Sequence, residues 1–169
     1  MGQLILVRHG QASFGAEDYD QLSDLGKRQG YRLGEYWREA SHSTERSDAL
    51  DFDAVLIGSG MKTREVANTP ALIEQLRVLN PARQLLAAQC SGTFLLSRLG
   101  LLGRAPACTD LTSKPWVVES GVDVVPRAFA AHGNVATAGG CLASQYLVAW
   151  LIARLKGLDA AREVLHYFA

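Results

Sequence analysis

The sequence predicts an α/β fold, a three-layer sandwich around a mostly parallel sheet. Short continuous apolar runs at residues 4–7, 52–57 and 84–88 are typical of strands buried on both faces of such a sheet. Each run ends in a polar or glycine-containing turn, and segments with helical apolar spacing follow. The chain has 169 residues, 48% of them hydrophobic. Because chains of this size bury about two thirds of their unfolded surface, we expect one domain with a substantial core.

The N-terminal part is predicted to hold one strand and one helix. The strand, Leu4–Val7, is followed by a polar loop at Gln11–Gln21. Ser23 is suited to cap a helix that runs to about Glu39. Residues 41–48 contain no large apolar side chain, so they are the best linker candidate in the chain.

After this linker, strands and helices are expected to alternate. The expected extended segments are Phe52–Ile57, Gln84–Ala88, Val122–Val125 and Ala128–Ala131, and residues 134–138 lead into a glycine pair. The expected helices are Thr63–Ala67, Pro70–Leu79, Ser91–Leu99, Thr112–Trp116, Leu142–Leu155 and Asp159–Tyr167. In such folds, ligands bind at the carboxyl ends of the strands. Three of these ends carry suggestive residues: Arg8-His9-Gly10, Gly58-Ser59-Gly60 and Cys90-Ser91-Gly92.

Composition and charge exclude several classes of function. Lys and Arg together number 17, as do Asp and Glu, so the net charge is zero and no nucleic acid partner is expected. No apolar run approaches the roughly 20 residues of a membrane span, and no charged leader precedes the first apolar stretch, so we expect a cytoplasmic protein without membrane contact. The three cysteines form no CxxC pair, which argues against a disulfide framework and a zinc site. No metal or cofactor is expected.

Residues 88–92 have the form small-x-Cys-x-Gly, which is typical of a strand-to-helix elbow that carries a nucleophile. The helix that follows points its N-terminus at Cys90, and that positive end favours the thiolate. The alternative is a small buried hydrophobic residue, as free cysteines often are. Cys108 and Cys141 lack such a setting, and we expect both in the core.

Residues 51–169 resemble the PfpI family of the class I glutamine-amidotransferase-like superfamily, near the isonitrile hydratase branch. The matching stretches are FDAVLIGSG (52–60), QCSGTFLL (89–96), GLLG (100–103), ACTDLT (107–112) and GNVATAGGCLAS (133–144). The resemblance implies a flavodoxin-like sheet, a homodimer, Cys90 as nucleophile, and Asp110 beside it. It also implies an oxyanion and substrate pocket made by backbone amides near Gly60 and Ser91, in a loop with Gly58 and Ser59.

This chain departs from the PfpI pattern at its N-terminal side. Family members supply an acidic residue from an N-terminal strand–helix unit, which poises the cysteine, and no such unit precedes Asp51 here. We therefore expect His9 to replace the missing acid. His9 would form a Cys–His pair with Cys90, and Arg8 would favour the thiolate.

Residues 1–45 resemble a different family, the histidine phosphatase (phosphoglycerate-mutase-like) superfamily. The resemblance rests on Arg8-His9-Gly10 at a strand end, followed by QLSDLG (21–26) and an amphipathic helix. It implies that His9 takes a phosphoryl group while arginines clamp its oxygens. Aligning Ser59 with the family's later Ser-Pro-x-x-Arg-like element places Thr63 where a second Arg is needed. We interpret His132, which mimics the second histidine, as a loop residue.

The chain is thus predicted to be a chimera, joined between about Ser41 and Asp51. It would form a single α/β domain, 1–169, from a phosphatase-like part (1–45) and a PfpI-like part (46–169). The first hypothesis is a cysteine-dependent hydrolase or hydratase acting on a small molecule, with an activity that is weak or lost. The alternatives are a non-enzymatic chimeric domain that self-associates, and a histidine phosphatase remnant that uses His9.

Overall fold

The computed structural model describes Asp24, Arg28 and residues 52–167. The chain divides into two compact units, residues 3–51 and residues 52–169, and residues 1–2 group with the second. Each unit is treated by itself.

Only two residues of the first unit are described. Asp24 and Arg28 are both helical and exposed, as the helix predicted from Ser23 requires. The expected strand Leu4–Val7, with Arg8 and His9 at its tip, lies outside the described residues, and so does the predicted linker.

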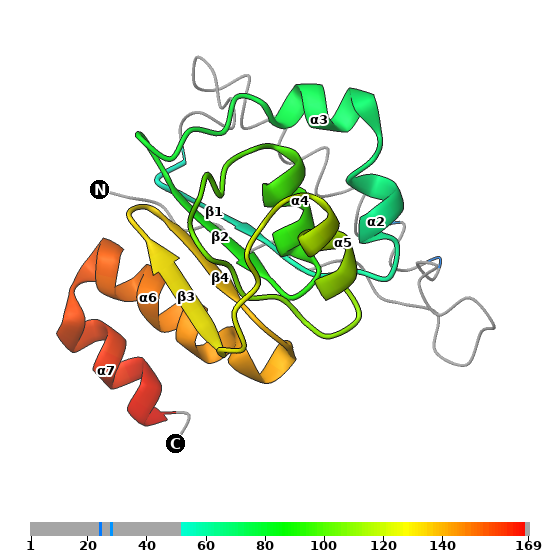
Figure 1. Ribbon diagram of the computed structural model, residues 1–169. Coiled ribbons are helices and arrows are strands. Elements are labelled where there is room, and N and C mark those ends of the chain that lie inside the picture. The colour runs from blue at the N-terminus through cyan, green and yellow to red at the C-terminus, as the bar shows by residue number, and fades with distance from the viewer. Residues whose placement is uncertain (1–23, 25–27, 29–51, 168–169) are drawn as a thin grey trace, which may run out of the picture. The chain divides into compact units, whose positions relative to one another are not determined.

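In the second unit, four strands form one sheet (Figure 1). Their order is β1 (Ala54–Ile57), β2 (Leu85–Gln89), β4 (Val135–Ala138) and β3 (Phe129–His132). The first three are parallel, and β3 pairs antiparallel to β4. This confirms the predicted α/β fold with a mostly parallel sheet. The register aligns the ends of β1, β2 and β4, so the turns that follow them meet at one edge.

Helices cover both faces of this sheet and complete the three layers (Figure 1). The helices on one face are α2 (Thr63–Val66), α3 (Pro70–Leu76), α4 (Gly92–Arg98) and α5 (Lys114–Glu119). On the other face, a short 3₁₀ turn, η1 (Cys141–Ala143), leads into α6 (Ser144–Lys156), which packs against α7 (Leu158–Tyr167).

Strand β2 is buried because its alternate side chains pack against the helices on the two faces of the sheet, whereas β1, at the sheet's edge, is partly exposed. Leu85 and Ala87 pack with Leu147 and Leu151 of α6. Ala88 points to the opposite face, where it packs in a cluster with Leu96 of α4. Burying a leucine side chain stabilises the fold by roughly 1.5–3 kcal/mol, so these contacts hold both helical layers on the sheet.

The boundaries of several helices differ from those predicted. Helix α3 ends at Leu76 and not at Leu79, because the chain turns there: the Leu79 N–H donates to the Leu76 carbonyl and Pro81 follows shortly. Helix α5 begins two residues later than expected and runs on to Glu119. His132 ends β3 and is exposed, so its interpretation as a loop residue was wrong.

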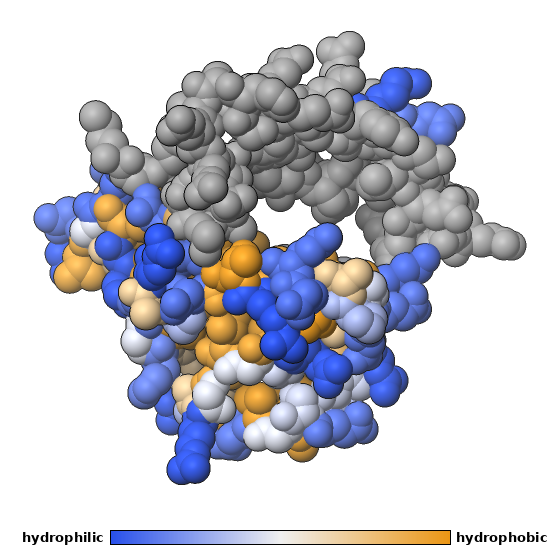
Figure 2. All heavy atoms as spheres, turned by 90° about the horizontal axis from the view of Figure 1, so that it is seen from above, coloured by the Kyte–Doolittle hydropathy of each residue, from blue (hydrophilic) through white to orange (hydrophobic). Residues whose placement is uncertain are grey.

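Figure 2, seen from above the view of Figure 1, shows hydrophobic residues at the surface of the described part of the chain, with hydrophilic residues on both sides of them. None of the helices in the described part of the chain has the length and apolar character that crossing a membrane requires.

Candidate active site

Cys90 lies in a strained turn at the end of β2. Its φ is 56°, and among the described residues it is the one non-glycine with positive φ. This conformation costs an L-residue about 1–2 kcal/mol, so the surrounding structure must hold it. Two hydrogen bonds do so: the Cys90 N–H donates to the Ala138 carbonyl (3.0 Å), and the Thr109 hydroxyl donates to the Cys90 carbonyl (2.9 Å). The strand-to-helix elbow predicted from the sequence is present.

Gly92 is the residue that lets this elbow close. A Cβ atom at this position would lie 2.6 Å from the Ile57 carbonyl oxygen and 2.7 Å from that of Gly58. The first turn of α4 therefore presses directly on the end of β1. Only a glycine permits this approach, which brings the β1 loop beside the cysteine.

The structure brings Asp110 into contact with Cys90. The Cys90 thiol donates a hydrogen bond to Asp110 Oδ2, with the sulfur and oxygen 3.1 Å apart. The other carboxylate oxygen, Oδ1, accepts from the backbone N–H groups of Thr112 (2.9 Å) and Ser113 (3.0 Å). These two bonds fix the carboxylate ahead of α5, so Oδ2 is held at the sulfur.

This environment keeps Cys90 protonated. Burial and, second, the hydrogen bond to Asp110 raise the pKa of the thiol from 9.0 to about 11, although the Ser91 backbone N–H lowers it. At such a pKa, only about one thiol in ten thousand is ionised at neutral pH. The Ser91 N–H at the start of α4 favours the thiolate, but burial and the neighbouring carboxylate outweigh it, so the thiol stays protonated.

Asp110 is shifted in the opposite direction. Burial raises its pKa, but hydrogen bonds from Ser113, Cys90 and Thr112 outweigh burial and hold the pKa below its ordinary value of 3.8. The pair therefore rests as a neutral thiol beside a carboxylate.

The loop after β1 reaches the same edge of the sheet, and a network of hydroxyl groups binds it to α4. The Gly60 N–H donates to the hydroxyl oxygens of Ser91 (3.2 Å) and Thr63 (3.1 Å). The Thr63 hydroxyl lies 2.7 Å from the Gly60 carbonyl and 2.9 Å from the Ser91 hydroxyl. The Gly60 amide, expected to face a developing oxyanion, is thus occupied in this structure.

The sequence analysis did not predict Thr63 as a site residue. The pattern that could have indicated it is its position at the start of a predicted helix, three residues after Gly60, where a threonine hydroxyl often bonds to nearby backbone. Gly58 and Ser59, in the same loop, are exposed. The Ser59 hydroxyl makes no hydrogen bond with a described residue.

A groove of about 730 Å³ opens beside Asp110. It runs over Gly139 and Gly140 at the end of β4 and is lined on its sides by Leu111 and Tyr146. Cys141 also lines this groove and is exposed, so the expectation that it belongs to the core was wrong. Cys108 is fully buried, as expected.

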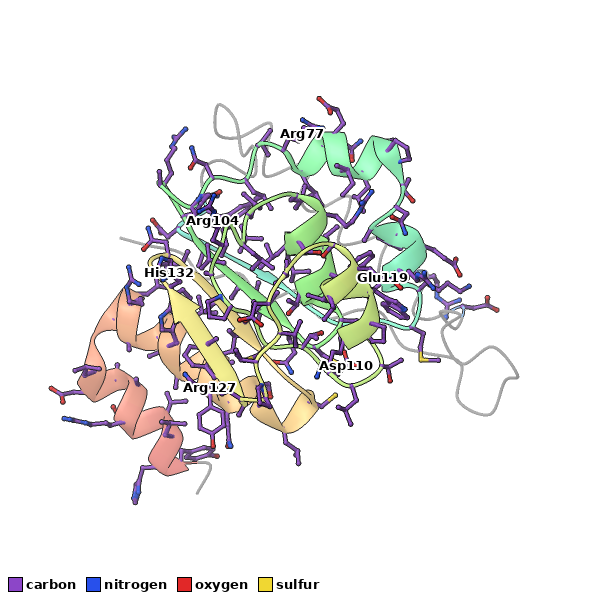
Figure 3. All side chains as sticks on the ribbon, in the orientation of Figure 1. Arg77, Arg104, Asp110, Glu119, Arg127 and His132 are labelled. Carbon is purple, nitrogen blue, oxygen red and sulfur yellow. The ribbon has the colours of Figure 1, made fainter. Side chains whose placement is uncertain are left out.

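Asp110 and Arg127 lie at the edge of the sheet where the parallel strands end, whereas Arg104 and His132 lie at the opposite edge (Figure 3). His132 is thus remote from Cys90. His9 and Arg8 lie outside the described residues, so the Cys90–His9 pair stays a prediction. Among the side chains that the structure describes, no three of the types His, Cys, Asp and Glu converge as metal ligands would.

Comparison with known proteins identifies the fold. No family model matches the sequence, and no curated protein matches it. Solved structures do. DJ-1 of Schizosaccharomyces pombe matches with a TM-score of 0.63 at 15% identity, over 76% of this chain and 70% of its own.

Two further structures give the same result. A THiJ/PfpI family protein from Pseudomonas syringae has a TM-score of 0.58 at 18% identity, over 66% of this chain and 46% of its own. A DJ-1 superfamily protein from Salmonella typhimurium, solved as a mutant, has a TM-score of 0.59 at 24% identity, over 69% of this chain and 64% of its own. The described unit therefore has the DJ-1/PfpI fold. The chain spans about half to two thirds of the length of several of these structures.

Proposed function

We propose that the protein is a cysteine-dependent hydrolase or hydratase for a small electrophilic substrate, with Cys90 as nucleophile and Asp110 as the base that accepts its proton. The contact that carries this proposal is the 3.1 Å hydrogen bond from the Cys90 thiol to Asp110 Oδ2. The strained elbow and the groove add to it, because the Cys90 side chain is partly exposed and its partner Asp110 lines a groove of small-molecule size.

For an ester substrate, the reaction follows from these positions. The Cys90 sulfur bonds to the carbonyl carbon while the thiol proton passes to Asp110 Oδ2, and the carbonyl π pair moves onto its oxygen. The resulting tetrahedral species collapses, the C–O bond to the alcohol breaks, and Asp110 returns the proton to the departing oxygen. Water then attacks the thioester by the same route, which releases the acid and restores the thiol. A hydratase adds water through the same sulfur without losing a leaving group.

The raised pKa of Cys90 favours a concerted transfer over a thiolate formed in advance. Because the thiol is almost fully protonated at neutral pH, the proton has to leave as the new bond forms. Asp110 already accepts the thiol hydrogen bond, so no rearrangement is needed to receive the proton.

The Ser91 backbone N–H is the nearest candidate to stabilise the oxyanion. It already lowers the pKa of Cys90, which means that it favours negative charge at this position. A second donor would be the Gly60 N–H, once the hydroxyl groups of Ser91 and Thr63, which both accept from it, rotate away. Thr63 is then a positioning residue that holds the Gly60 loop in place.

The test is acyl transfer from 4-nitrophenyl acetate. We expect a burst of one equivalent of 4-nitrophenol and an acetyl group on Cys90, detected by peptide mass spectrometry. Cys90→Ala should abolish the burst, and Cys141→Ala, which removes an exposed cysteine of the same groove, should keep it. A burst that survives in Cys90→Ala contradicts the proposal.

Asp110→Asn separates the role of the base from that of the nucleophile. The asparagine carbonyl can still accept from Thr112 and Ser113, but its amide cannot take a proton. We expect acylation to slow about 100-fold or more, as for loss of a general base. The pKa read from iodoacetamide alkylation of Cys90 should fall below about 11, because the carboxylate no longer raises it. An acylation rate that is unchanged or faster would exclude Asp110 as the base.

A further inference from the structure

We infer that the groove beside Asp110 binds the anionic end of the substrate, so the substrate class is a short-chain electrophile that carries a carboxylate. This inference rests on the proposed function, since it takes Cys90 as the reacting group. The residues that would recognise the carboxylate are Arg127 and Lys114, which both line the groove.

Neither of these two cations is paired with a carboxylate in the described part of the chain. Neither side chain makes an ion pair or a hydrogen bond with any residue in the described part of the chain, unlike Arg77 and Arg162, which pair with carboxylates on their own helices. Lys114 is the first residue of α5, and Arg127 lies just before β3. Separate elements thus bring two free positive charges to one groove.

Asp110, the one carboxylate that lines the groove, offsets only one of these two positive charges. Its oxygens accept the Cys90 thiol and the N–H groups of Thr112 and Ser113, so the carboxylate is directed at the sulfur and the α5 backbone. The charged side chains that line the groove therefore sum to one positive charge, beside the carboxylate that contacts Cys90. A guanidinium suits a planar carboxylate well, because it can donate two parallel hydrogen bonds.

The remaining walls of the groove suit a carbon chain. Val124, Leu142 and Tyr146 are apolar residues that line it, and Leu142 is 92% exposed. The volume of about 730 Å³ lies within the usual range of small-molecule sites, roughly 300–1,000 Å³. Apolar walls with cations at the rim fit a molecule with a reactive carbon, a short apolar segment and a terminal carboxylate.

The test compares two alkylating reagents that differ in charge, iodoacetate and iodoacetamide, on the full chain. The rate of modification of Cys90 is read by peptide mass spectrometry at one fixed pH. The iodoacetate-to-iodoacetamide ratio is then divided by the same ratio for free N-acetylcysteine. We expect this normalised ratio to be about three to ten, as for one or two partly exposed charge pairs, and to fall as salt is added.

The variants localise the effect. Arg127→Gln and Lys114→Gln should each lower the normalised ratio, and the double variant should bring it to about one. Arg104→Gln is the matched control, because it removes an exposed arginine at the opposite edge of the sheet (Figure 3) and should leave the ratio unchanged. Salt dependence in the unmodified protein gives the same information without any substitution.

The outcomes distinguish this inference from the proposed function. One contrary result is that both reagents modify Cys90 with a ratio equal to that of the free thiol, and another is a ratio that does not change in the double variant. Either result contradicts the proposed anion site but leaves Cys90 as the proposed nucleophile. If neither reagent modifies Cys90 in the folded protein, the proposed nucleophile is wrong, and the substrate class is withdrawn with it.

Discussion

At the scale of the residue, Cys90 combines backbone strain with a protonated side chain. Its φ of 56° places it in a region that glycine occupies freely and other residues rarely. Burial and, second, the hydrogen bond to Asp110 raise the pKa of its thiol to about 11. Neither property helps the fold, since strain costs stability and a buried thiol gains little from its one hydrogen bond. Both are understandable if the position is set by reactivity.

The strain at Cys90 leads to a prediction about two substitutions. Cys90→Gly and Cys90→Ala both remove the thiol, but only glycine relieves the left-handed backbone. We expect Cys90→Gly to be more stable than Cys90→Ala by about 1 kcal/mol, the usual difference at a site of positive φ. Urea unfolding of the two variants measures it. Equal stabilities, or a more stable alanine variant, would mean that the elbow is not strained.

At the scale of the element, the site depends on how closely α4 approaches β1. The contact is made between the backbone of Gly92 and the carbonyls of Ile57 and Gly58. The hydroxyl groups of Ser91 and Thr63 then bind the loop that follows β1. The strand, the loop and the helix are thus held together by backbone contacts, which side-chain substitutions elsewhere would not disturb.

Gly92→Ala should therefore be clearly destabilising. The added methyl would lie 2.6 Å from the Ile57 carbonyl oxygen, and neither backbone can yield without moving the sheet edge or the helix. We expect a loss of about 1–3 kcal/mol of unfolding free energy, as for other overpacked positions. Gly140→Ala is the control, because its Cβ would meet open space and its φ of −64° suits any residue. A difference of less than about 0.5 kcal/mol between them would contradict the close approach.

Helix α6 depends on a buried leucine in its first turn. Leu147 is 1% exposed and packs against Leu85 and Ala87 of β2, whereas Leu142, just before the helix, is 92% exposed. We expect Leu147→Ala to cost about 2–5 kcal/mol and Leu142→Ala to be nearly neutral. Thermal and urea unfolding of the two variants provide the measurement. Similar costs at both positions would mean that α6 does not pack on the sheet as described.

At the scale of the whole molecule, the fold was largely predictable from the sequence. Parallel strands are short and apolar, and β1 and β2 lie within two residues of their expected ranges. Strand β4 falls in residues 134–138, for which no strand was expected. The expected extended segment Val122–Val125 is not a strand of the sheet: Val124 forms an isolated bridge with Ala107. Helix α5 was misplaced for a tertiary reason. The β-branched pair Val117-Val118 disfavours a helix locally, but Val117 is fully buried and packs with Phe94, and this contact overrides the propensity.

The site was predictable in part. The elbow at Cys90 was visible because small residues at fixed spacing are needed for the turn, and Asp110 was proposed from the family resemblance. The chemical state of the thiol was not visible, because it depends on burial and on a carboxylate twenty residues away. Folding alone brings three further residues to the site, because they are distant from Cys90 in the sequence: Thr63, Lys114 and Arg127. The predictions about His9, Arg8, the single domain and the homodimer stay predictions.

The paired shifts of Cys90 and Asp110 also determine how stability depends on pH. The pKa of Cys90 is raised from its ordinary 9.0 to about 11 in the folded state, so the unfolded chain loses this proton first as pH rises. The contribution of Cys90 to the unfolding free energy is therefore fully present below about pH 9, and it is lost as the pH rises toward 11. The pKa of Asp110 lies below 3.8, so its contribution is present above about pH 4 and is lost as pH falls.

We test the alkaline side by measuring the unfolding free energy of the unmodified protein and of Cys90→Ala between about pH 8 and pH 11. Other thiols, tyrosines and lysines titrate in both proteins, so the difference between the two curves isolates Cys90. Because the thiol is partly exposed, we expect the unmodified protein to lose only about 1 kcal/mol more than the variant over this range. A difference that does not change with pH would mean that Cys90 has the same pKa in the folded and unfolded chain. The thiol would then not be held by Asp110, and the base proposed for the reaction would have to be sought elsewhere in the protein.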